Sequence, residues 1–147
     1  MSDIRPWPVV QEGISLHPVE TVQYLLRERG EDVAVDGVFG PQTVAAVRAF
    51  QARLALPADG VVGPPTWEAL IVVVRRGSTG QAVRAVQGEF HYRGIATNLT
   101  SSVVVDGVFG EATEGIVRGF QHGVEIAVDG VVDPVTWRAL VSDMLTC

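Results

Sequence analysis

The side chains of this chain that could do chemistry include four aspartates, each followed directly by a glycine. They are Asp36, Asp59, Asp106 and Asp129. Such carboxylates could act as acid and base pairs, or they could bind calcium. Asp-Gly is also strong turn chemistry, because aspartate accepts backbone hydrogen bonds and glycine tolerates a positive φ. The dense alternation of acidic residues typical of a calcium loop is missing, so the pattern favours turns over metal binding and catalysis.

Other reactive side chains are few and do not form a recognisable set. The histidines His17, His91 and His122 do not lie at metal-ligand spacing, and we expect them at exposed surface positions. Cys147 is the last residue and is a poor candidate nucleophile. The chain has no GxSxG elbow and contains no lysine to complete a phosphate-binding loop. The sequence therefore predicts no catalytic residue, no metal site and no cofactor.

The aspartates belong to a stretch of sequence that occurs twice. The motif VDGVFG is found at Val35–Gly40 and again at Val105–Gly110. Residues 36–70 align with residues 106–140 without a gap, and 19 of these 35 aligned positions are identical. A repeat of this kind defines the architecture before any single motif does. We expect two small domains, residues 1–72 with an extended N-terminal lead-in and residues 76–147.

The spacing of apolar residues predicts three short helices in the first copy. The first should run from about Pro18 to Arg29, and the others should begin at Pro41 and Pro64, because proline suits a first helical turn. Short valine-rich segments beside the turns are expected to pair only briefly. Trp7, which lies between two prolines of the lead-in, is expected to pack on this copy as a structural anchor.

The second copy repeats the same pattern with local changes. Its helices should span about residues 81–93 and 111–123, with a third beginning at Pro134 after an Asp133 cap. The second copy has six additional residues between Gly94 and Asp106, and the mostly polar run 97–102 of this region is predicted to form a solvated loop. The predicted fold class is therefore all-α, as two tandem three-helix domains.

Polar and aromatic side chains that recur in both copies are the candidates for ligand binding. The glutamines and arginines could tie the turns to the helices, or they could present donors and acceptors to a polar ligand, and the sequence leaves both open. Phe50 and Trp67 favour the core, whereas Phe39 on a turn could equally stack on a sugar. The candidate ligand-binding residues are Gln23, Asp36, Phe39, Thr43, Arg48, Gln51, Asp59, Gln87, Asp106, Phe109, Thr113, Arg118, Gln121 and Asp129.

Composition excludes some classes of partner. The net charge of −6 argues against nucleic acid and against an anionic membrane surface. No apolar run approaches the roughly 20 residues needed to span a membrane. The first residues do not resemble a secretory signal, so the expected location is the cell wall or outside if the chain is exported, and otherwise the cytoplasm or a particle.

The repeated pattern resembles the peptidoglycan-binding domain family of bacterial cell-wall hydrolases. The pattern VQ-x-L-L-x-x-x-G, DG-x-FG-x-x-T, AV-x-x-FQ and DG-x-VG-x-x-TW-x-x-L covers Pro18–Leu70 closely and Gly77–Leu140 less closely. The resemblance implies a compact, non-catalytic module that recognises the glycan strand or stem peptide of peptidoglycan. A cell-wall hydrolase is the partner it implies. The alternatives are a structural or adaptor component of a phage or contractile injection assembly and, less favoured, an unrecognised hydrolase.

Overall fold

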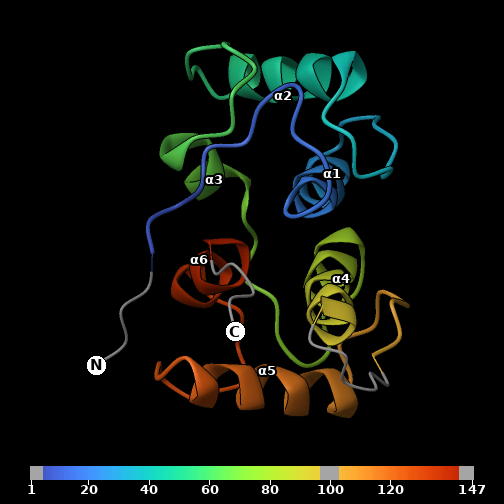
Figure 1. Ribbon diagram of the computed structural model, residues 1–147, viewed down its shortest axis with the longest axis vertical. Coiled ribbons are helices and arrows are strands. Elements are labelled where there is room, and N and C mark those ends of the chain that lie inside the picture. Colours follow the sequence, from blue (N-terminus) through green and yellow to red (C-terminus); the bar gives the residue numbers. More distant parts are fainter. Residues whose placement is uncertain (1–4, 97–102, 143–147) are drawn as a thin grey trace.

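The computed structural model describes residues 5–96 and 103–142, and each copy of the repeat contributes three helices (Figure 1). Within these residues the chain forms helices and loops, with no extended strand. The helices are α1 (Val19–Glu28), α2 (Pro41–Arg53), α3 (Pro64–Leu70), α4 (Gln81–Ala96), α5 (Glu111–Gly123) and α6 (Pro134–Ser142). The predicted all-α class is confirmed.

Most helices begin where proline and capping chemistry predicted. α1 begins one residue after Pro18, and α4 extends three residues beyond the predicted end at Arg93. Asp133 caps α6 as expected, because its Oδ1 accepts the backbone N–H of Thr136 at 2.9 Å. The predicted solvated loop at residues 97–102 lies outside the described residues.

The segments that precede α1 and α4 are used in the same way in the two copies. The indole N–H of Trp67 donates to the carbonyl of Pro8, and that of Trp137 donates to the carbonyl of Val72, both at 2.7 Å. The expected brief pairing of valine-rich segments is confirmed at the two Val–Val pairs among the four isolated antiparallel bridges of the described residues. The four bridges are Val10–Val62, Ser15–Val38, Val74–Val132 and Thr79–Val108. The connection between the copies thus completes the second copy as the lead-in completes the first.

Aromatic residues fill the core of each copy. Trp7 stacks on Trp67 with the ring centroids 5.5 Å apart, which confirms its expected role as an anchor. Phe50 and Trp67 are buried as predicted. Phe39 and its counterpart Phe109, whose role the sequence left open, are each 1% exposed and therefore belong to the core. No sugar could stack on them without opening the fold.

An arginine in each copy holds the last helix of that copy against the first. Arg29, at the end of α1, donates to three carbonyl oxygens at the end of α3, at 2.6–3.1 Å. Arg93 of α4 likewise donates to the carbonyl of Leu140 in α6 at 2.8 Å. The last carbonyls of a helix lack partners within it and carry partial negative charge, so a guanidinium is well suited there.

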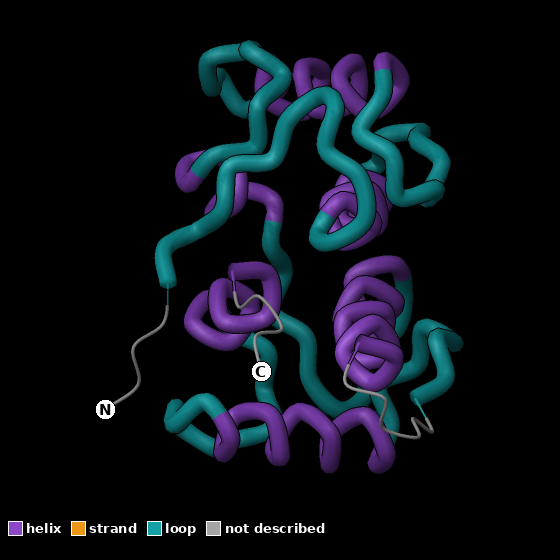
Figure 2. Tube along the Cα trace, in the orientation of Figure 1, coloured by secondary structure: helices purple, strands orange, loops and turns teal. Residues whose placement is uncertain are grey.

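The two copies meet where α1 packs on α4, in the middle of the molecule (Figures 1 and 2). α2 and α5 lie at opposite ends of the molecule (Figure 2). Glu28 of α1 accepts the backbone N–H of Ala82 at 2.9 Å and so caps the first turn of α4. The first copy therefore supplies a capping group to a helix of the second.

Candidate functional site

Each of the four Asp-Gly turns is held by one buried glutamine. The side-chain NH2 of Gln23 donates to Asp36 Oδ1, to the carbonyl of Val38 and to Thr43 Oγ1, at 2.9–3.1 Å. Its carbonyl oxygen accepts the backbone N–H groups of Asp36 and Gly37. Gln23 is fully buried, so its hydrogen-bonding groups are used inside the fold.

The other three turns are built in the same way. Each glutamine is 1% exposed and bonds to an aspartate of the turn and to a threonine in the first turn of the next helix. The sets are Gln51 with Asp59 and Thr66, Gln87 with Asp106 and Thr113, and Gln121 with Asp129 and Thr136. Of the two roles that the sequence left open, these side chains perform the tying role. Direct contact between any of them and a ligand stays a prediction.

The turn aspartates are stabilised as carboxylates. The backbone N–H of Val38 donates to Asp36 Oδ1 at 3.0 Å, and this bond, with that from Gln23, holds the pKa of Asp36 below its usual value. The pKa values of Asp59, Asp106 and Asp129 are lowered for the same first reason, a backbone N–H two residues on. The glycine after each aspartate has a φ between +74° and +78°, which explains the Asp-Gly pairing.

One helical position distinguishes the first turn from the other three. Three residues before the glutamine, an arginine lies over the turn glycine, with its Nε 3.1–3.2 Å from the point a Cβ of that glycine would occupy. These residues are Arg48, Arg84 and Arg118. In the first turn the residue is Glu20, whose Oε2 lies 3.5 Å from the corresponding point of Gly37. The positive charge of each of these arginines also lowers the pKa of the aspartate in its own turn. The first turn therefore has a carboxylate over its glycine where the other three have a guanidinium.

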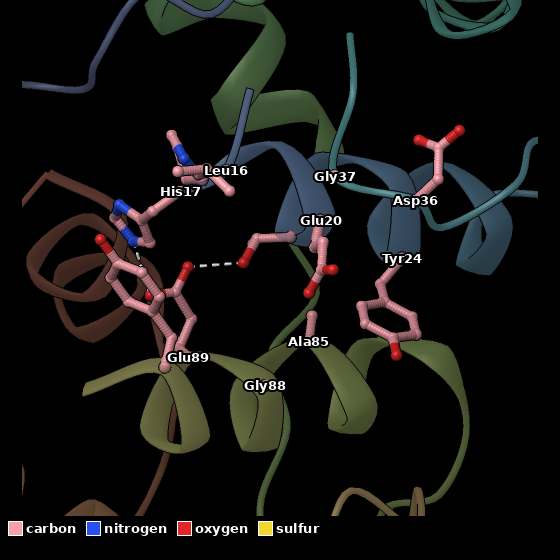
Figure 3. Close-up of a pocket in the computed structure, with 12 residues that line it drawn as sticks. Leu16, His17, Glu20, Tyr24, Asp36, Gly37, Ala85, Gly88 and Glu89 are labelled. Carbon is pink, nitrogen blue, oxygen red and sulfur yellow. Dashed lines mark hydrogen bonds and ion pairs between the residues drawn. The ribbon is translucent and has the colours of Figure 1, made fainter. Parts of the chain in front are cut away.

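A cavity of about 150 Å³ lies between α1 and α4, next to this exceptional turn (Figure 3). Its walls come from both copies of the repeat. The residues that line it are Leu16, His17, Pro18, Glu20, Thr21, Tyr24, Asp36, Gly37, Ala85, Gly88, Glu89 and Tyr92. In Figure 3 the carboxylate of Glu20 points toward α4, whereas that of Asp36 turns away from it.

A buried carboxylate forms one wall of the cavity. Glu89 occupies the position that Leu25 has in the first copy, and its side chain is fully buried. Its Oε1 lies 2.8 Å from His17 Nε2, and its Oε2 accepts the hydroxyl hydrogen of Thr21 at 2.5 Å. The His17 ring stacks on Tyr92 with the centroids 4.9 Å apart. These contacts join a helix of each copy through polar groups.

The expectation that His17 lies exposed at the surface is wrong, since its side chain is only 7% exposed. Its partner, Glu89, belongs to the other copy, and the position of His17 in the sequence does not reveal this contact. His91 and His122 are exposed, as expected.

One of the differences between the two central helices leaves space at the cavity. Tyr24 of α1 corresponds to Gly88 of α4. A Cβ on Gly88 would lie 3.9 Å from Tyr24 Cε2, so the missing side chain leaves space beside the tyrosine. The cavity is thus a product of the pairing of two unequal copies.

The residues of both copies match one known family. A family model described as "Putative peptidoglycan binding domain" matches residues 16–70 and 79–140.

The chain belongs to this family.

Relatives of this peptidoglycan-binding family member include cell-wall enzymes. The N-acetylmuramoyl-L-alanine amidase CwlM of Mycobacterium tuberculosis is 33% identical in sequence over 76% of this chain and 29% of the amidase. The zinc D-Ala-D-Ala carboxypeptidase of Streptomyces albus G is 53% identical over 26% of this chain and 15% of the enzyme. Among solved structures, the SleB N-terminal domain is 41% identical over 43% of this chain and 88% of that chain, with a TM-score of 0.42. The chain spans less than a third of either curated relative.

Of the residues predicted to bind ligand, only Asp36 lines the cavity of this family member. Arg48 and Arg118 lie exposed on α2 and α5, and the others are distributed over the four turns and the core. Sequence reasoning missed Glu20, Tyr24 and Glu89 as a group. The signal that could have found them is that these positions differ between two otherwise similar copies.

Two further observations concern metal binding and membrane spanning. Among residues 5–96 and 103–142, no three His, Cys, Asp or Glu side chains come together as a metal site. In the same part of the chain, no helix combines the length and apolar character needed to cross a membrane.

Proposed function

We propose that this chain binds peptidoglycan without cleaving it, using both copies of the family module. The observation that carries the proposal is that the family match extends over both copies, from residue 16 to 70 and from 79 to 140. The repeated turn aspartates and the buried Glu89 have structural partners. The carboxylates of the four turns accept backbone bonds, and that of Glu89 joins the two central helices.

The packing of α1 on α4 supports binding by the pair as one unit. Glu89 and Glu28 form hydrogen bonds between the copies, so the two modules are held at a set distance and orientation. Two weak sites on one chain gain apparent affinity for a polymer when both can engage the same strand. We infer that repeating polymer units are bound more tightly than a single short fragment.

Sedimentation with purified sacculi tests the proposal. The full chain should appear in the pellet with sacculi and remain in the supernatant without them, while the heat-denatured chain serves as the control. The same supernatants, analysed by liquid chromatography, should contain no soluble muropeptides above that control. A failure to sediment would overturn the binding proposal, and muropeptide release would overturn its non-catalytic part.

We also propose a cell-wall hydrolase as the functional partner. The matched amidase is much longer than the matched region, so in that protein the module is accompanied by additional sequence. Addition of the full chain to a bacterial lysate, followed by sacculus sedimentation, should enrich a muramyl-amide or glycan hydrolase activity in the pellet. An unchanged activity would count against this partner.

A further inference from the structure

We propose that the cavity between α1 and α4 binds a primary ammonium group, with the Glu20 carboxylate as its counter-charge. This inference deepens the proposed function, because peptidoglycan carries such amines. One source is the diamino acid of the stem peptide, and the other is a glucosamine that has lost its acetyl group.

Charge is the first argument. At the three positions equivalent to Glu20 the chain has arginine, and each arginine lies over the glycine of its own turn. At the cavity this cation is replaced by a carboxylate that points toward α4 (Figure 3). None of the lining residues is an arginine. The other acidic lining residues are Asp36, whose carboxylate turns away from α4, and Glu89, which is paired with His17. A cationic ligand would therefore be attracted, and an anionic one repelled.

Shape is the second and independent argument. The substitution of Gly88 for the tyrosine of the first copy removes a side chain from the centre of the helix pair. The resulting cavity has a volume of about 150 Å³. An engineered protein cavity of roughly this volume binds benzene, a ligand of six heavy atoms. An aminoalkyl chain of about five heavy atoms falls within this size.

The walls also suit an alkylammonium group. Tyr24 and Tyr92 both line the cavity, and a tyrosine ring attracts a cation over its face within about 6 Å. Ala85 and Gly88 form an apolar surface on α4 below Glu20, against which an aliphatic stem could pack (Figure 3). The hydrogen bonds that Glu89 makes with His17 and Thr21 hold its carboxylate in position, so the wall does not need to reorganise on binding.

The test uses the full 15N-labelled chain and small amines of defined structure. Nα-acetyl-L-lysine amide is compared with its Nε-acetylated counterpart, and D-glucosamine is compared with N-acetylglucosamine, by two-dimensional NMR at constant pH and ionic strength. We expect the free amine of at least one pair to shift the amide signals of Tyr24, Gly88 and Tyr92, with no saturable shift from its acetylated form. The pair that responds identifies the source of the amine.

Variants at the cavity make the test specific. Glu20→Gln should weaken amine binding by roughly 1.5- to fivefold, the range expected for one exposed ion pair. Glu20→Arg, which restores the residue type of the other three turns, should abolish it, and Gly88→Leu should do so by filling the space. The matched control is Glu68→Gln, which removes an exposed glutamate of α3 outside the cavity and should bind as the unmodified chain does. Circular dichroism checks that every variant is folded.

Sacculi separate this inference from the proposed function. Treatment with acetic anhydride acetylates their free amines, and treated and untreated sacculi are sedimented with the chain. Equal binding to both, with no NMR response to either free amine, would overturn the ammonium site while peptidoglycan binding stands. No binding to either preparation would overturn the proposed function, whereas the NMR titration would still decide whether the cavity takes an amine. Unchanged amine binding in Glu20→Arg would also overturn the assignment.

Discussion

Replacing Gln51 by leucine should cost this protein a large part of its stability. The Gln51 side-chain NH2 donates to Asp59, Thr66 and the carbonyl of Val61, and its oxygen accepts the N–H of Gly60 at 3.0 Å. Leucine is similar in volume and is a good helix former, so the change removes the hydrogen bonds with little effect on packing or helix propensity.

The magnitude follows from the groups that lose their partner. A buried donor or acceptor without a partner costs about 1–3 kcal/mol, and at least two backbone groups, the N–H at position 60 and the carbonyl at position 61, lose theirs. The expected loss in the free energy of unfolding is therefore about 2–6 kcal/mol. Small domains have about 5–15 kcal/mol in total, so this loss would be a large fraction of the stability of the chain.

A control is available in the same helix. Gln42 of α2 is exposed and accepts a single bond, from the N–H of Ala34 at 3.0 Å. Water can replace that bond, so Gln42→Leu should change stability by no more than about 0.5 kcal/mol. Urea unfolding followed by far-ultraviolet circular dichroism measures both. If Gln51→Leu and Gln42→Leu fell within 0.5 kcal/mol of each other, the view that the buried amide holds the turn would be refuted.

Three further predictions concern the turns, α5 and the contact between the copies. The four turn aspartates have pKa values below 3.8, so the stability they contribute is complete above that pH and is lost as the pH falls through their lower folded-state values. The melting temperature of the wild type should therefore drop more steeply below about pH 3.8 than that of the variant with all four aspartates changed to asparagine. Parallel curves for the two proteins would contradict this prediction. A Cβ on Gly115 or Gly119 would meet nothing within 4 Å, so these glycines are not needed for close helix packing. Changing both to alanine should therefore raise the free energy of unfolding, measured in urea, by roughly 0.5–1 kcal/mol for each glycine. Glu28→Ala removes the cap that α1 supplies to Ala82 and should lower stability by about 0.5–2 kcal/mol, with amide hydrogen exchange rising first in the first turn of α4; a uniform rise across the chain would point to a different cause.

The sequence by itself determined the helices, the turns and the two-fold repetition. These features depend on neighbours along the chain: proline at positions 41 and 64 begins a helix, Asp133 caps one, and an Asp-Gly pair makes a turn. The recurrence of the Asp-Gly turns and of the helices that follow them, at an offset of 70 residues, made the assignment stronger than any single motif could. Periodicity also placed Phe50 and Trp67 in the core, because a helix buries the face on which its apolar residues gather.

Only the tertiary structure decided how the two copies meet and what lies between them. Glu89 is bonded to residues 68 and 72 positions earlier, and no local pattern indicates which surfaces of two small domains will pack together. A charged residue on a core face is ambiguous in sequence, since it can be a tolerated exception or, as here, one half of a polar contact whose other half is distant. The cavity has the same origin, because it requires Gly88 of one copy to face Tyr24 of the other.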